Sequence, residues 1–559
     1  MMHVNCYSQI FFEDRAVDLG LDITCGSTFL GNGVSFVDFD GDGLDDLTFA
    51  TEVDQPVRFF KNQGGSFVEH FFNYTDPNRA TKQINWVDID NDGDKDLFVT
   101  SHTEGNKLYE NQGNNNLLDI TSDSNLPITN LGTYGASWGD YNNDGYLDVF
   151  ISNRENNTIP NYLFKNLGNK TFLDVSGEAG ISDLNQVSFC SAFIDFNNDG
   201  WQDIYVSNDR FENKNVMYKN NGDGTFSDVS ESSKTDIIAD AMSVTVGDYN
   251  KDGWFDIYVT NSPVGNYLLV NQGNETFINQ GNESGTAFYS WGWGAVFLDA
   301  DNDDDIDLYV SGDRDGSNPY LPSAAFYENN NDLTFSESVD NGFENDTSAS
   351  FSNAIGDFDN DGRTDIVVTN VDDPVFAWKN LSVTSNNWLK LKLIGTTSNR
   401  DAVGTRIEIS ENGNQQFHYV NCGEGYLSQN SFSEYIGVGG TTVIDYIKVN
   451  WLSGIEEYFY DVGVNQTFEI IEGTGTLSTE TSENLILKLS PNPVENELNI
   501  ENNSLFTRYK IFNNLGQLIV NHSADFPIAR IDVSTLPSGL YFLRFTGDEK
   551  EFSFKFIKI

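Results

Sequence analysis

The segment Asp38-Phe39-Asp40-Gly41-Asp42-Gly43-Leu44-Asp45-Asp46 stands between two apolar segments, Val34–Val37 and Leu47–Phe49. The same pattern, D-x-[DN]-x-D-G-x-x-D, returns six more times along the chain, beginning at Asp88, Asp140, Asp195, Asp248, Asp299 and Asp357. The steps between successive starts are 50, 52, 55, 53, 51 and 58 residues. This period is typical of a four-stranded propeller blade and is longer than most helical repeats. The sequence therefore predicts an all-β fold that begins with a seven-bladed β-propeller.

Most repeats carry a second signature after the loop, in which a Tyr is followed by Asn-x-Gly and a Phe, as in Tyr218 to Phe226. Two apolar strands joined by an Asn/Gly turn form a hairpin, so each blade should have four strands. After Asn380 the chain changes character before a fourth strand, while residues 10–20 match the fourth-strand segment 172–180. We expect the N-terminal strand to complete blade seven and remove the open sheet edges.

The acidic loop has the composition of a calcium site. Side-chain oxygens at positions 1, 3, 5 and 9, with a backbone carbonyl at position 7, can surround a hard cation at ~2.3–2.6 Å. An EF-hand would place Glu at position 12, but all seven of those positions here are apolar. Position 6 is Gly in six copies and Asp304 in the sixth, so we expect the sixth site to be the least favourable. Up to seven structural Ca²⁺ ions are expected.

The predicted metal ligands are one set of five residues per loop. They are Asp38, Asp40, Asp42, Leu44 and Asp46; Asp88, Asp90, Asp92, Asp94 and Asp96; Asp140, Asn142, Asp144, Tyr146 and Asp148; Asp195, Asn197, Asp199, Trp201 and Asp203; Asp248, Asn250, Asp252, Trp254 and Asp256; Asp299, Asp301, Asp303, Asp305 and Asp307; Asp357, Asp359, Asp361, Arg363 and Asp365.

The formal net charge of the chain is −54, and most of it belongs to residues 1–383, which hold 18 basic and 64 acidic side chains. Such a surface repels nucleic acids and anionic membranes and favours cations. No apolar run approaches the ~20 residues that span a bilayer, so no membrane span is predicted. The four cysteines have no zinc-ligand spacing, and a Cys6–Cys25 disulfide and buried free thiols are both open alternatives.

With its seven acidic loops between strands, the chain resembles the FG-GAP/VCBS repeat family over residues 10–380. The resemblance implies an integrin-α-like propeller, here assigned to residues 1–382. Residues 383–473 contain Gly423-Glu424-Gly425-Tyr426 and Asn450-Trp451-Leu452-Ser453-Gly454. They are similar to the ASPIC/UnbV domain, although that family usually has Pro where this chain has Leu452. Arg400, Arg406, Tyr426 and Gln429 are candidates for a ligand surface there, with ordinary turn and sheet contacts as the more common use of such residues.

Residues 474–486 are rich in Thr, Ser and Glu and are predicted to be a linker. Residues 487–559 hold 8 basic and 8 acidic side chains and include Pro491-Asn492-Pro493 and Leu536-Pro537-Ser538-Gly539. They resemble the type A sorting domain of the type IX secretion system, a C-terminal β-sandwich. This resemblance implies a Gram-negative bacterial protein that is secreted or held at the outer cell surface, with the type IX machinery as a partner. Since the N-terminus lacks a signal-peptide pattern, we expect that a leader is missing from it.

No catalytic residues are predicted. Gly135-Ala136-Ser137-Trp138-Gly139 matches G-x-S-x-G, but a calcium loop follows directly where a nucleophile elbow needs a helix, so Ser137 is expected in a strand. Trp291 and Trp293 could line a central funnel and stack on a sugar, or pack in the core. The favoured function is non-catalytic binding or adhesion to an unknown extracellular protein or glycan. The alternative is a calcium-stabilised polysaccharide lyase or glycoside hydrolase.

Overall fold

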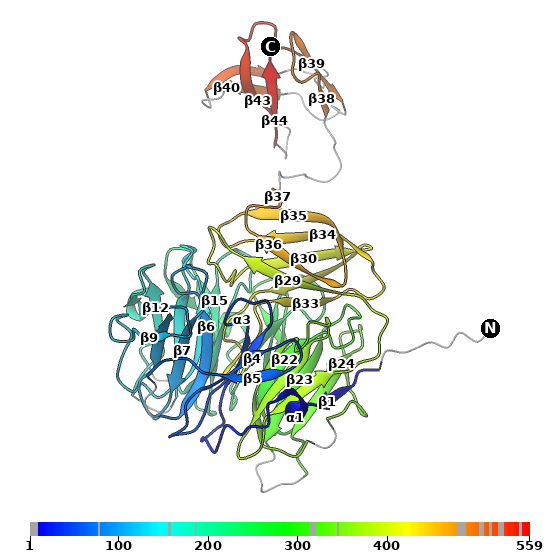
Figure 1. Cartoon of the computed structure of the whole chain (residues 1–559). Coiled ribbons are helices and arrows are strands. Elements are labelled where there is room, and N and C mark those ends of the chain that lie inside the picture. Colours follow the sequence, from blue (N-terminus) through cyan, green and yellow to red (C-terminus); the bar gives the residue numbers. More distant parts are fainter. Residues whose placement is uncertain are drawn as a thin grey trace, which may run out of the picture. The chain divides into compact units, whose positions relative to one another are not determined.

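The computed structural model describes residues 9–559 apart from 76–78, 155–157, 185, 314–319, 344–345, 478–487, 502–507, 514–516, 524–529 and 547–550. The chain divides into two compact units, Met1–Leu477 and Ser478–Ile559. Strands dominate both units (Figure 1), and the described helices are three single turns, α1 (Ala16–Leu19), α2 (Ser176–Ala179) and α3 (Ser230–Ser233). The all-β prediction is confirmed.

Seven sheets of the first unit share one pattern of four antiparallel strands. Sheets 1 to 3 are β2 (Val34–Val37), β3 (Asp46–Phe49), β4 (Arg58–Asn62) and β5 (Phe67–His70); β6 (Thr81–Val87), β7 (Asp96–Ser101), β8 (Lys107–Asn111) and β9 (Leu117–Asp119); β10 (Thr133–Gly139), β11 (Asp148–Asn153), β12 (Tyr162–Asn166) and β13 (Phe172–Asp174). Sheets 4 and 5 are β14 (Ser188–Ile194), β15 (Asp203–Asn208), β16 (Val216–Asn220) and β17 (Phe226–Asp228); β18 (Val244–Gly247), β19 (Asp256–Val259), β20 (Tyr267–Asn271) and β21 (Phe277–Asn279). Sheets 6 and 7 are β22 (Trp291–Leu298), β23 (Asp307–Asp313), β24 (Ala324–Asn329) and β25 (Phe335–Glu337); β26 (Ser350–Gly356), β27 (Asp365–Asn370), β28 (Phe376–Asn380) and β1 (Phe12–Asp14).

Sheet 7 takes its fourth strand from the other end of the unit. Strand β1 pairs antiparallel with β28, so that Phe12 lies opposite Asn380 and Asp14 opposite Trp378. Helix α1 then follows β1 as α2 follows β13 and α3 follows β17, and each turn ends at a left-handed residue, Gly20, Gly180 or Lys234. The N-terminal segment therefore has the local structure of a fourth strand and its exit turn.

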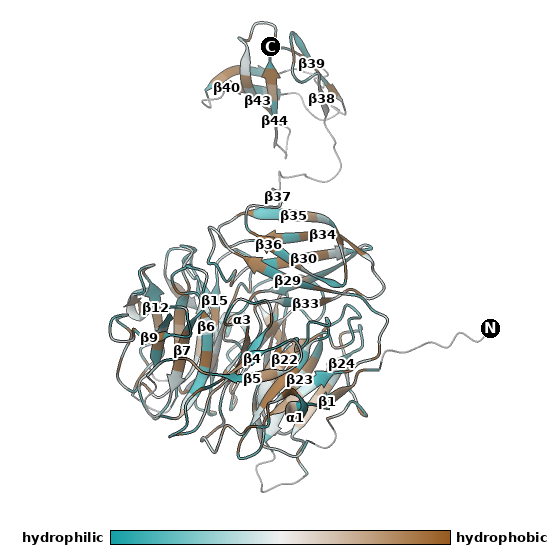
Figure 2. Ribbon diagram, viewed as in Figure 1, coloured by the Kyte–Doolittle hydropathy of each residue, from teal (hydrophilic) through white to brown (hydrophobic). Residues whose placement is uncertain are grey.

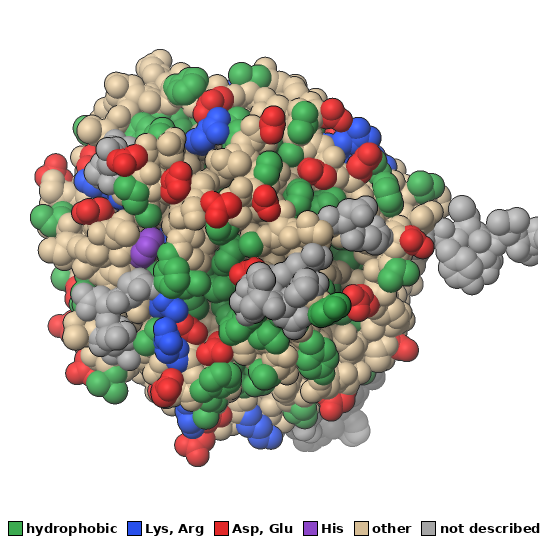
Figure 3. Space-filling model, turned by 90° about the horizontal axis from the view of Figure 1, so that it is seen from below, with side chains coloured by type: hydrophobic (Ala, Val, Ile, Leu, Met, Phe, Trp, Pro, Cys, Tyr) green, Lys and Arg blue, Asp and Glu red, His purple; other side chains and the backbone are tan. Residues whose placement is uncertain are grey.

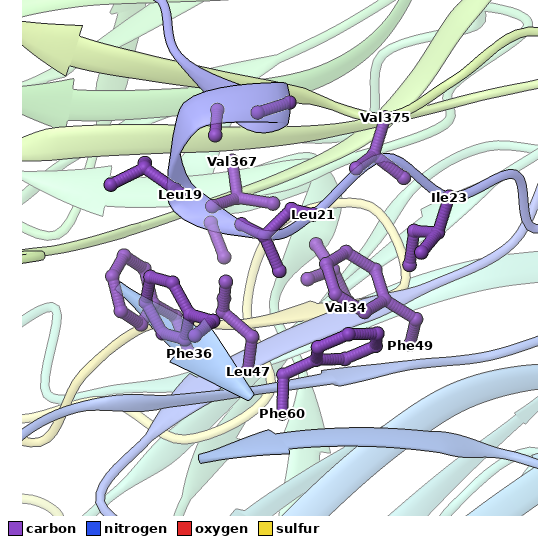
Figure 4. Close-up of a cluster of buried hydrophobic side chains, with 14 of the residues drawn as sticks. Leu19, Leu21, Ile23, Val34, Phe36, Leu47, Phe49, Phe60, Val367 and Val375 are labelled. Carbon is purple, nitrogen blue, oxygen red and sulfur yellow. The ribbon is translucent and has the colours of Figure 1, made fainter. Parts of the chain in front are cut away.

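Buried apolar side chains pack between each sheet and the next, and also between sheet 7 and sheet 1. Figure 4 shows this last cluster, which contains Leu21 together with Phe36 and Phe49 of sheet 1 and Val367 of sheet 7. The sheets thus form a closed ring, because every sheet face that would otherwise meet water is covered by a neighbour. In Figure 2 the hydrophobic colour follows the strands of this ring, and the loops are more hydrophilic.

The rest of the first unit is a second domain, residues 388–477, with two sheets around one core. One sheet has β29 (Trp388–Ile394), β33 (Glu434–Gly437) and β36 (Gln466–Ile471); the other has β30 (Arg406–Glu411), β31 (Asn414–Tyr419), β34 (Val443–Asn450), β35 (Glu456–Gly463) and β37 (Thr476–Leu477). Strand β32 (Ser428–Gln429) leaves this domain and pairs with β2 of the ring. Since β37 pairs with β35, the domain extends past residue 473, and the predicted linker 474–486 begins too early. Residues 478–486 of that linker lie outside the described residues.

The second unit also has two sheets that share a core. They consist of β38 (Lys488–Ser490), β39 (Glu497–Glu501) and β42 (Arg530–Asp532), and of β40 (Arg508–Asn513), β41 (Leu518–Ser523), β43 (Gly539–Thr546) and β44 (Glu551–Lys558). Cys25, Cys190 and Cys422 are buried free thiols, whereas Cys6 lies outside the described residues. On the face drawn in Figure 3, acidic side chains are spread among hydrophobic ones and basic side chains are fewer.

Candidate metal centres

All seven acidic loops connect the first and second strands of a sheet. The side chain of the first loop residue fixes the conformation of the loop backbone. In every loop the carboxylate at position 1 accepts hydrogen bonds of 2.8 to 3.2 Å from the backbone N–H groups of positions 5 and 6. For Asp140 the donors are Asp144 and Gly145. These bonds wrap the backbone around the acid and fix the loop before any ion binds.

Positions 4 and 6 of the loops both have positive φ. Position 6 spans φ values from 82° to 100°, and Asp304 of loop 6 has 85°, inside the range of the six glycines. Position 4 lies between 54° and 75° and is Asn in five loops, Gly41 in loop 1 and Lys251 in loop 5. Loop 6 therefore keeps the common backbone, and its Asp304 does not distort the site.

The carboxylate at position 9 anchors the loop to the hairpin that follows. Its Oδ1 accepts a bond of 2.7 to 2.9 Å from the backbone N–H of the Asn in each Asn-x-Gly turn. Burial raises the pKa of Asp46 and of Asp96 to about 8, and it raises the pKa of Asp140, at position 1 of loop 3, to about 7. Without a cation, these groups therefore favour protonation because they are removed from water.

The oxygens at position 3 indicate what the loops can hold. Buried oxygens of Asp90, Asn142, Asn197 and Asp359 have no hydrogen-bond partner, although a buried polar oxygen rarely stays unpaired. In four loops, three carboxylates bring one oxygen each to within 4.8 Å of the others: Asp38, Asp40 and Asp42; Asp88, Asp90 and Asp96; Asp299, Asp301 and Asp303; Asp357, Asp359 and Asp365. Loops 3 to 5 have Asn at position 3, and so they bring fewer carboxylates together. These oxygen donors fit Ca²⁺, with the ligands predicted above at positions 1, 3, 5 and 9.

Several side chains at position 7 contact other parts of the protein, so the backbone carbonyl is the expected ligand at this position. The rings of Tyr146, Trp201 and Trp254 pack against Gly168, Gly222 and Gly273 of the following turns. Arg363 forms an ion pair with Asp361. Asp94 and Asp305 add further carboxylates in loops 2 and 6. Leu44 lies in loop 1 and offers only its backbone.

Neighbouring loops are joined by side chains that the sequence reasoning missed. Asn at position 4 donates to the position 6 carbonyl of the next loop at 2.7 to 3.3 Å, from loop 2 to 3, 3 to 4, 4 to 5, 6 to 7 and 7 to 1. Between loops 5 and 6 an ion pair of 3.1 Å from Lys251 to Asp304 replaces this bond. The departures from the pattern at these two positions therefore compensate each other. The Asn that recurs at position 4 of five loops was the sequence feature from which these inter-loop bonds could have been predicted.

The Asn of the Asn-x-Gly turn forms a second inter-loop bond. Its Nδ2 donates to the position 2 carbonyl of the preceding loop at 2.8 to 3.2 Å in six of the seven sheets, from Asn62, Asn166, Asn220, Asn271, Asn329 and Asn380. An Asn therefore recurs here for its amide as well as for its turn geometry. Among the described residues, the two bonds together link the loops at six of the seven junctions, and the junction between loops 1 and 2 has neither.

The compensation between Lys251 and Asp304 can be tested with a double-mutant cycle. Lys251→Asn alone should lower the free energy of unfolding by about 1 kcal/mol, because Asp304 then lies among loop 6 carboxylates without its cation. Adding Asp304→Gly recreates the common pair, relieves a non-glycine residue at φ 85° and should recover at least that loss. Urea unfolding in saturating calcium measures both. Additive effects of the two substitutions would contradict the pairing.

The second domain lies over the acidic loops. Lys392 Nζ is 3.8 Å from Asp38, Arg400 Nε is 3.9 Å from Asp88, and Arg406 donates to the Gly253 carbonyl at 2.9 Å. Asn386 donates to the Asp301 carbonyl at 3.0 Å. Arg400 and Arg406, predicted as candidates for a ligand surface, therefore face loops 2 and 5. An open surface made by all four predicted residues is not formed.

The other two candidates lie in the plug segment, residues 422–432, which enters the middle of the ring. Tyr426 is fully buried, packs on Trp293 at 5.0 Å between ring centres and donates to the Leu30 carbonyl at 2.8 Å. Gln429 bonds both backbone groups of Trp86, at 2.7 and 2.8 Å. Because this segment fills the funnel, Trp293 is a core residue there and offers no sugar platform.

Ser137 lies in β10, as predicted, and its hydroxyl hydrogen-bonds that of Ser191 at 2.7 Å. Among the described residues, the acidic clusters that could hold a metal contain no histidine.

Family models match three parts of the chain. An FG-GAP-like repeat matches residues 38–99, 88–151, 140–206, 195–259 and 252–310, ASPIC and UnbV matches 395–477, and a secretion system C-terminal sorting domain matches 488–559. The chain combines FG-GAP-like repeats, an ASPIC and UnbV domain and a secretion sorting domain. The sorting domain directs it through type IX secretion to the cell surface or outside. No helix among the described residues has the length and apolar character of a membrane span.

The chain is similar to a protein of the same name in two vertebrates. Cartilage acidic protein 1 of Xenopus tropicalis is 21% identical over 454 residues, covering 76% of this chain and 61% of that protein. Cartilage acidic protein 1 of Homo sapiens is 26% identical over 315 residues, covering 50% and 47%. The chain thus spans about half to three-fifths of the length of these relatives. Among solved structures, the extracellular domain of BT4673 from B. thetaiotaomicron aligns with 99% of this chain and 60% of that one, at 11% identity and a TM-score of 0.37.

Proposed function

We propose that the ring is a seven-bladed, calcium-loaded β-propeller, and that the protein is a non-catalytic binding or adhesion protein for an extracellular protein or glycan. The main support for calcium is the set of buried, unpaired oxygens at position 3 of loops that are already wrapped around their first carboxylate. The ions are structural, since the loops form the rim of the ring and support the ASPIC and UnbV domain. Sorting to the cell exterior supplies the calcium-rich setting that weak sites of this kind need.

A second candidate function is a calcium-stabilised polysaccharide lyase. It is favoured by one observation, a cleft between loops 1 and 2 that is lined by His70, Lys392 and Arg400. Burial lowers the pKa of His70, which favours the neutral imidazole, the form that can accept a proton. The cleft therefore contains a base and cations, the two kinds of group that proton abstraction beside a carboxylate needs.

One experiment separates the two functions. The secreted protein is screened on glycan and matrix-protein arrays with calcium and with EDTA, and each bound saccharide is then incubated with the protein and its products are separated. We expect calcium-dependent binding with every saccharide recovered at full length. Shortened products with an unsaturated terminal sugar would replace the binding proposal with the lyase. Equal binding in EDTA would contradict the role of calcium.

A further inference from the structure

The rim of the ring is interrupted at one junction. The amide of Asn at position 4 and the amide of the Asn-x-Gly turn cross most junctions between neighbouring loops, yet within the described residues neither crosses from loop 1 to loop 2. Position 4 of loop 1 is Gly41, which has no side chain, and the Asn111 amide donates only within its own sheet, to the Lys95 carbonyl at 3.1 Å. Two independent sequence features therefore leave loops 1 and 2 without either of these bonds. Sheets 1 and 2 are joined nearby instead, where the Asn73 amide donates to Asn116 at 2.9 Å.

A cleft of about 460 Å³ opens at this junction. Its walls are loop 1, loop 2, the turn at Gly113–Asn115 and strand β29 of the ASPIC and UnbV domain. The half-buried rings of His70, Phe72 and Phe432 also line it. A volume of several hundred cubic ångströms with rings and polar groups on its walls is typical of a site for a small molecule or one or two sugar units.

Four cationic side chains line the cleft, and they fall into two pairs. Lys95, which is half-buried, and Lys390, which is buried, are both neutralised, Lys95 by Asp401 and Lys390 by Asp45 at 3.3 Å. Lys392 and Arg400 are different, because their side chains are 40% and 44% exposed. Their ionic contacts, at 3.8 and 3.9 Å to Asp38 and Asp88, are too long for hydrogen bonds. Within the part of the chain that the structure describes, two cations with unused donors thus face the open cleft.

Calcium decides whether this pair can attract an anion. Asp38 and Asp88, the nearest carboxylates to Lys392 and Arg400, are position 1 ligands of loops 1 and 2. Without metal their negative charge opposes an incoming anion and neutralises the two cations. Two divalent ions held by Asp38 and Asp88 and their loops would offset this negative charge and leave Lys392 and Arg400 for a ligand.

We propose that the cleft between loops 1 and 2 binds a uronic-acid saccharide, whose carboxylate lies between Lys392 and Arg400 when calcium fills both loops. A saccharide suits the walls better than an acidic peptide, since the exposed amide of Asn114 can meet hydroxyls and the rings of His70 and Phe72 can pack on a sugar face. This inference rests on the proposed function, because it needs the calcium loops and names the ligand class.

The test is calorimetric titration of the full chain with galacturonate and mannuronate tetrasaccharides in calcium. The variant Lys392→Gln with Arg400→Gln should weaken binding at least about tenfold, the effect of losing one hydrogen bond to a charged group. The control removes two cations outside the cleft, Arg15→Gln with Lys448→Gln, and should bind like wild type. Both variants should keep the melting-temperature rise with calcium, because Lys392 and Arg400 only face the loops.

A second variant tests the open junction itself. Asn at position 41 restores the side chain that five other loops have, at a φ of 75° that Asn tolerates, and no heavy atom lies within 4 Å of the new Cβ. Gly41→Asn should narrow the cleft and weaken saccharide binding about tenfold, with the calcium-induced melting shift retained. Normal binding by both Gly41→Asn and the cation variant would overturn the site.

Other outcomes would distinguish a failure of the saccharide site from a failure of the proposed calcium binding. If calcium raises the melting temperature but no uronate tetrasaccharide binds, or if tetra-glutamate binds and the saccharides do not, this inference is wrong and the calcium-loaded ring stands. If calcium leaves the melting temperature unchanged, the proposed function itself fails. A neutral glucose tetrasaccharide that binds as tightly as the uronates would also overturn the role of the two cations.

Discussion

Chelation of calcium is expected to lower the free energy of unfolding of the Met1–Leu477 unit by about 10 kcal/mol. A site that is filled at ten times its Kd adds about 1.4 kcal/mol, and up to seven sites add together. Since a domain is stable by only ~5–15 kcal/mol, loss of the ions should unfold much of the unit or lower its melting temperature by tens of degrees. Calorimetry of the full chain with calcium and with EDTA measures this, and magnesium in place of calcium is the control.

The pH dependence of the same melting curves tests whether calcium stabilises the protein by binding the buried carboxylates. Burial raises the folded pKa of Asp46 and Asp96 to about 8, above the value of about 4 in an unfolded chain. The folded state then binds more protons between these values, so the EDTA-treated protein should lose stability as pH rises from about 5 to about 8. Calcium replaces those protons, and its stabilisation should grow over the same range. Parallel curves with calcium and EDTA would contradict metal binding at these carboxylates.

Removing the aromatic ring of Tyr426, at the centre of the plug segment, should be strongly destabilising. Tyr426→Ala should lower the free energy of unfolding by about 3–5 kcal/mol, the usual cost of an aromatic ring removed from a core. The ring is fully buried between Phe189 and Trp293, and it joins the second domain to sheets 4 and 6. Urea unfolding followed by tryptophan fluorescence measures the loss, because Trp293 itself contacts Tyr426.

Two control variants separate the effect of the buried Tyr426 ring from that of losing an exposed tyrosine or of losing only the hydroxyl group. Tyr460→Ala removes a tyrosine that is 55% exposed, so it should change stability by less than about 0.5 kcal/mol. Tyr426→Phe keeps the ring and loses only the bond to the Leu30 carbonyl, at a cost of about 1 kcal/mol. If Tyr426→Ala behaves like Tyr460→Ala, the plug segment does not hold the second domain in the ring.

The acidic loops and the seven repeats were predictable because their structure is local. The Asp140 carboxylate accepts bonds from residues only four and five positions away, Asp144 and Gly145. Each copy of the nine-residue pattern therefore forms the same bonds. The strands on either side follow from apolar segments of matching length, and β1 could be assigned because residues 10–20 match residues 172–180. For the same reason, the predicted ligands at positions 1 and 9 form the same hydrogen bonds in every loop.

Only the tertiary structure decided where the second domain lies and what it fills. Gln429 and Trp86 are 343 residues apart, and nothing in either local sequence indicates that their amide and backbone meet. Lys392 and Arg400 reach loops 1 and 2 in the same way, across hundreds of residues. The amino-acid sequence by itself determined the loops, because their bonds close within nine residues. The covered loops, the filled funnel and the open junction depend on how separately folded surfaces pack, which residue spacing does not encode.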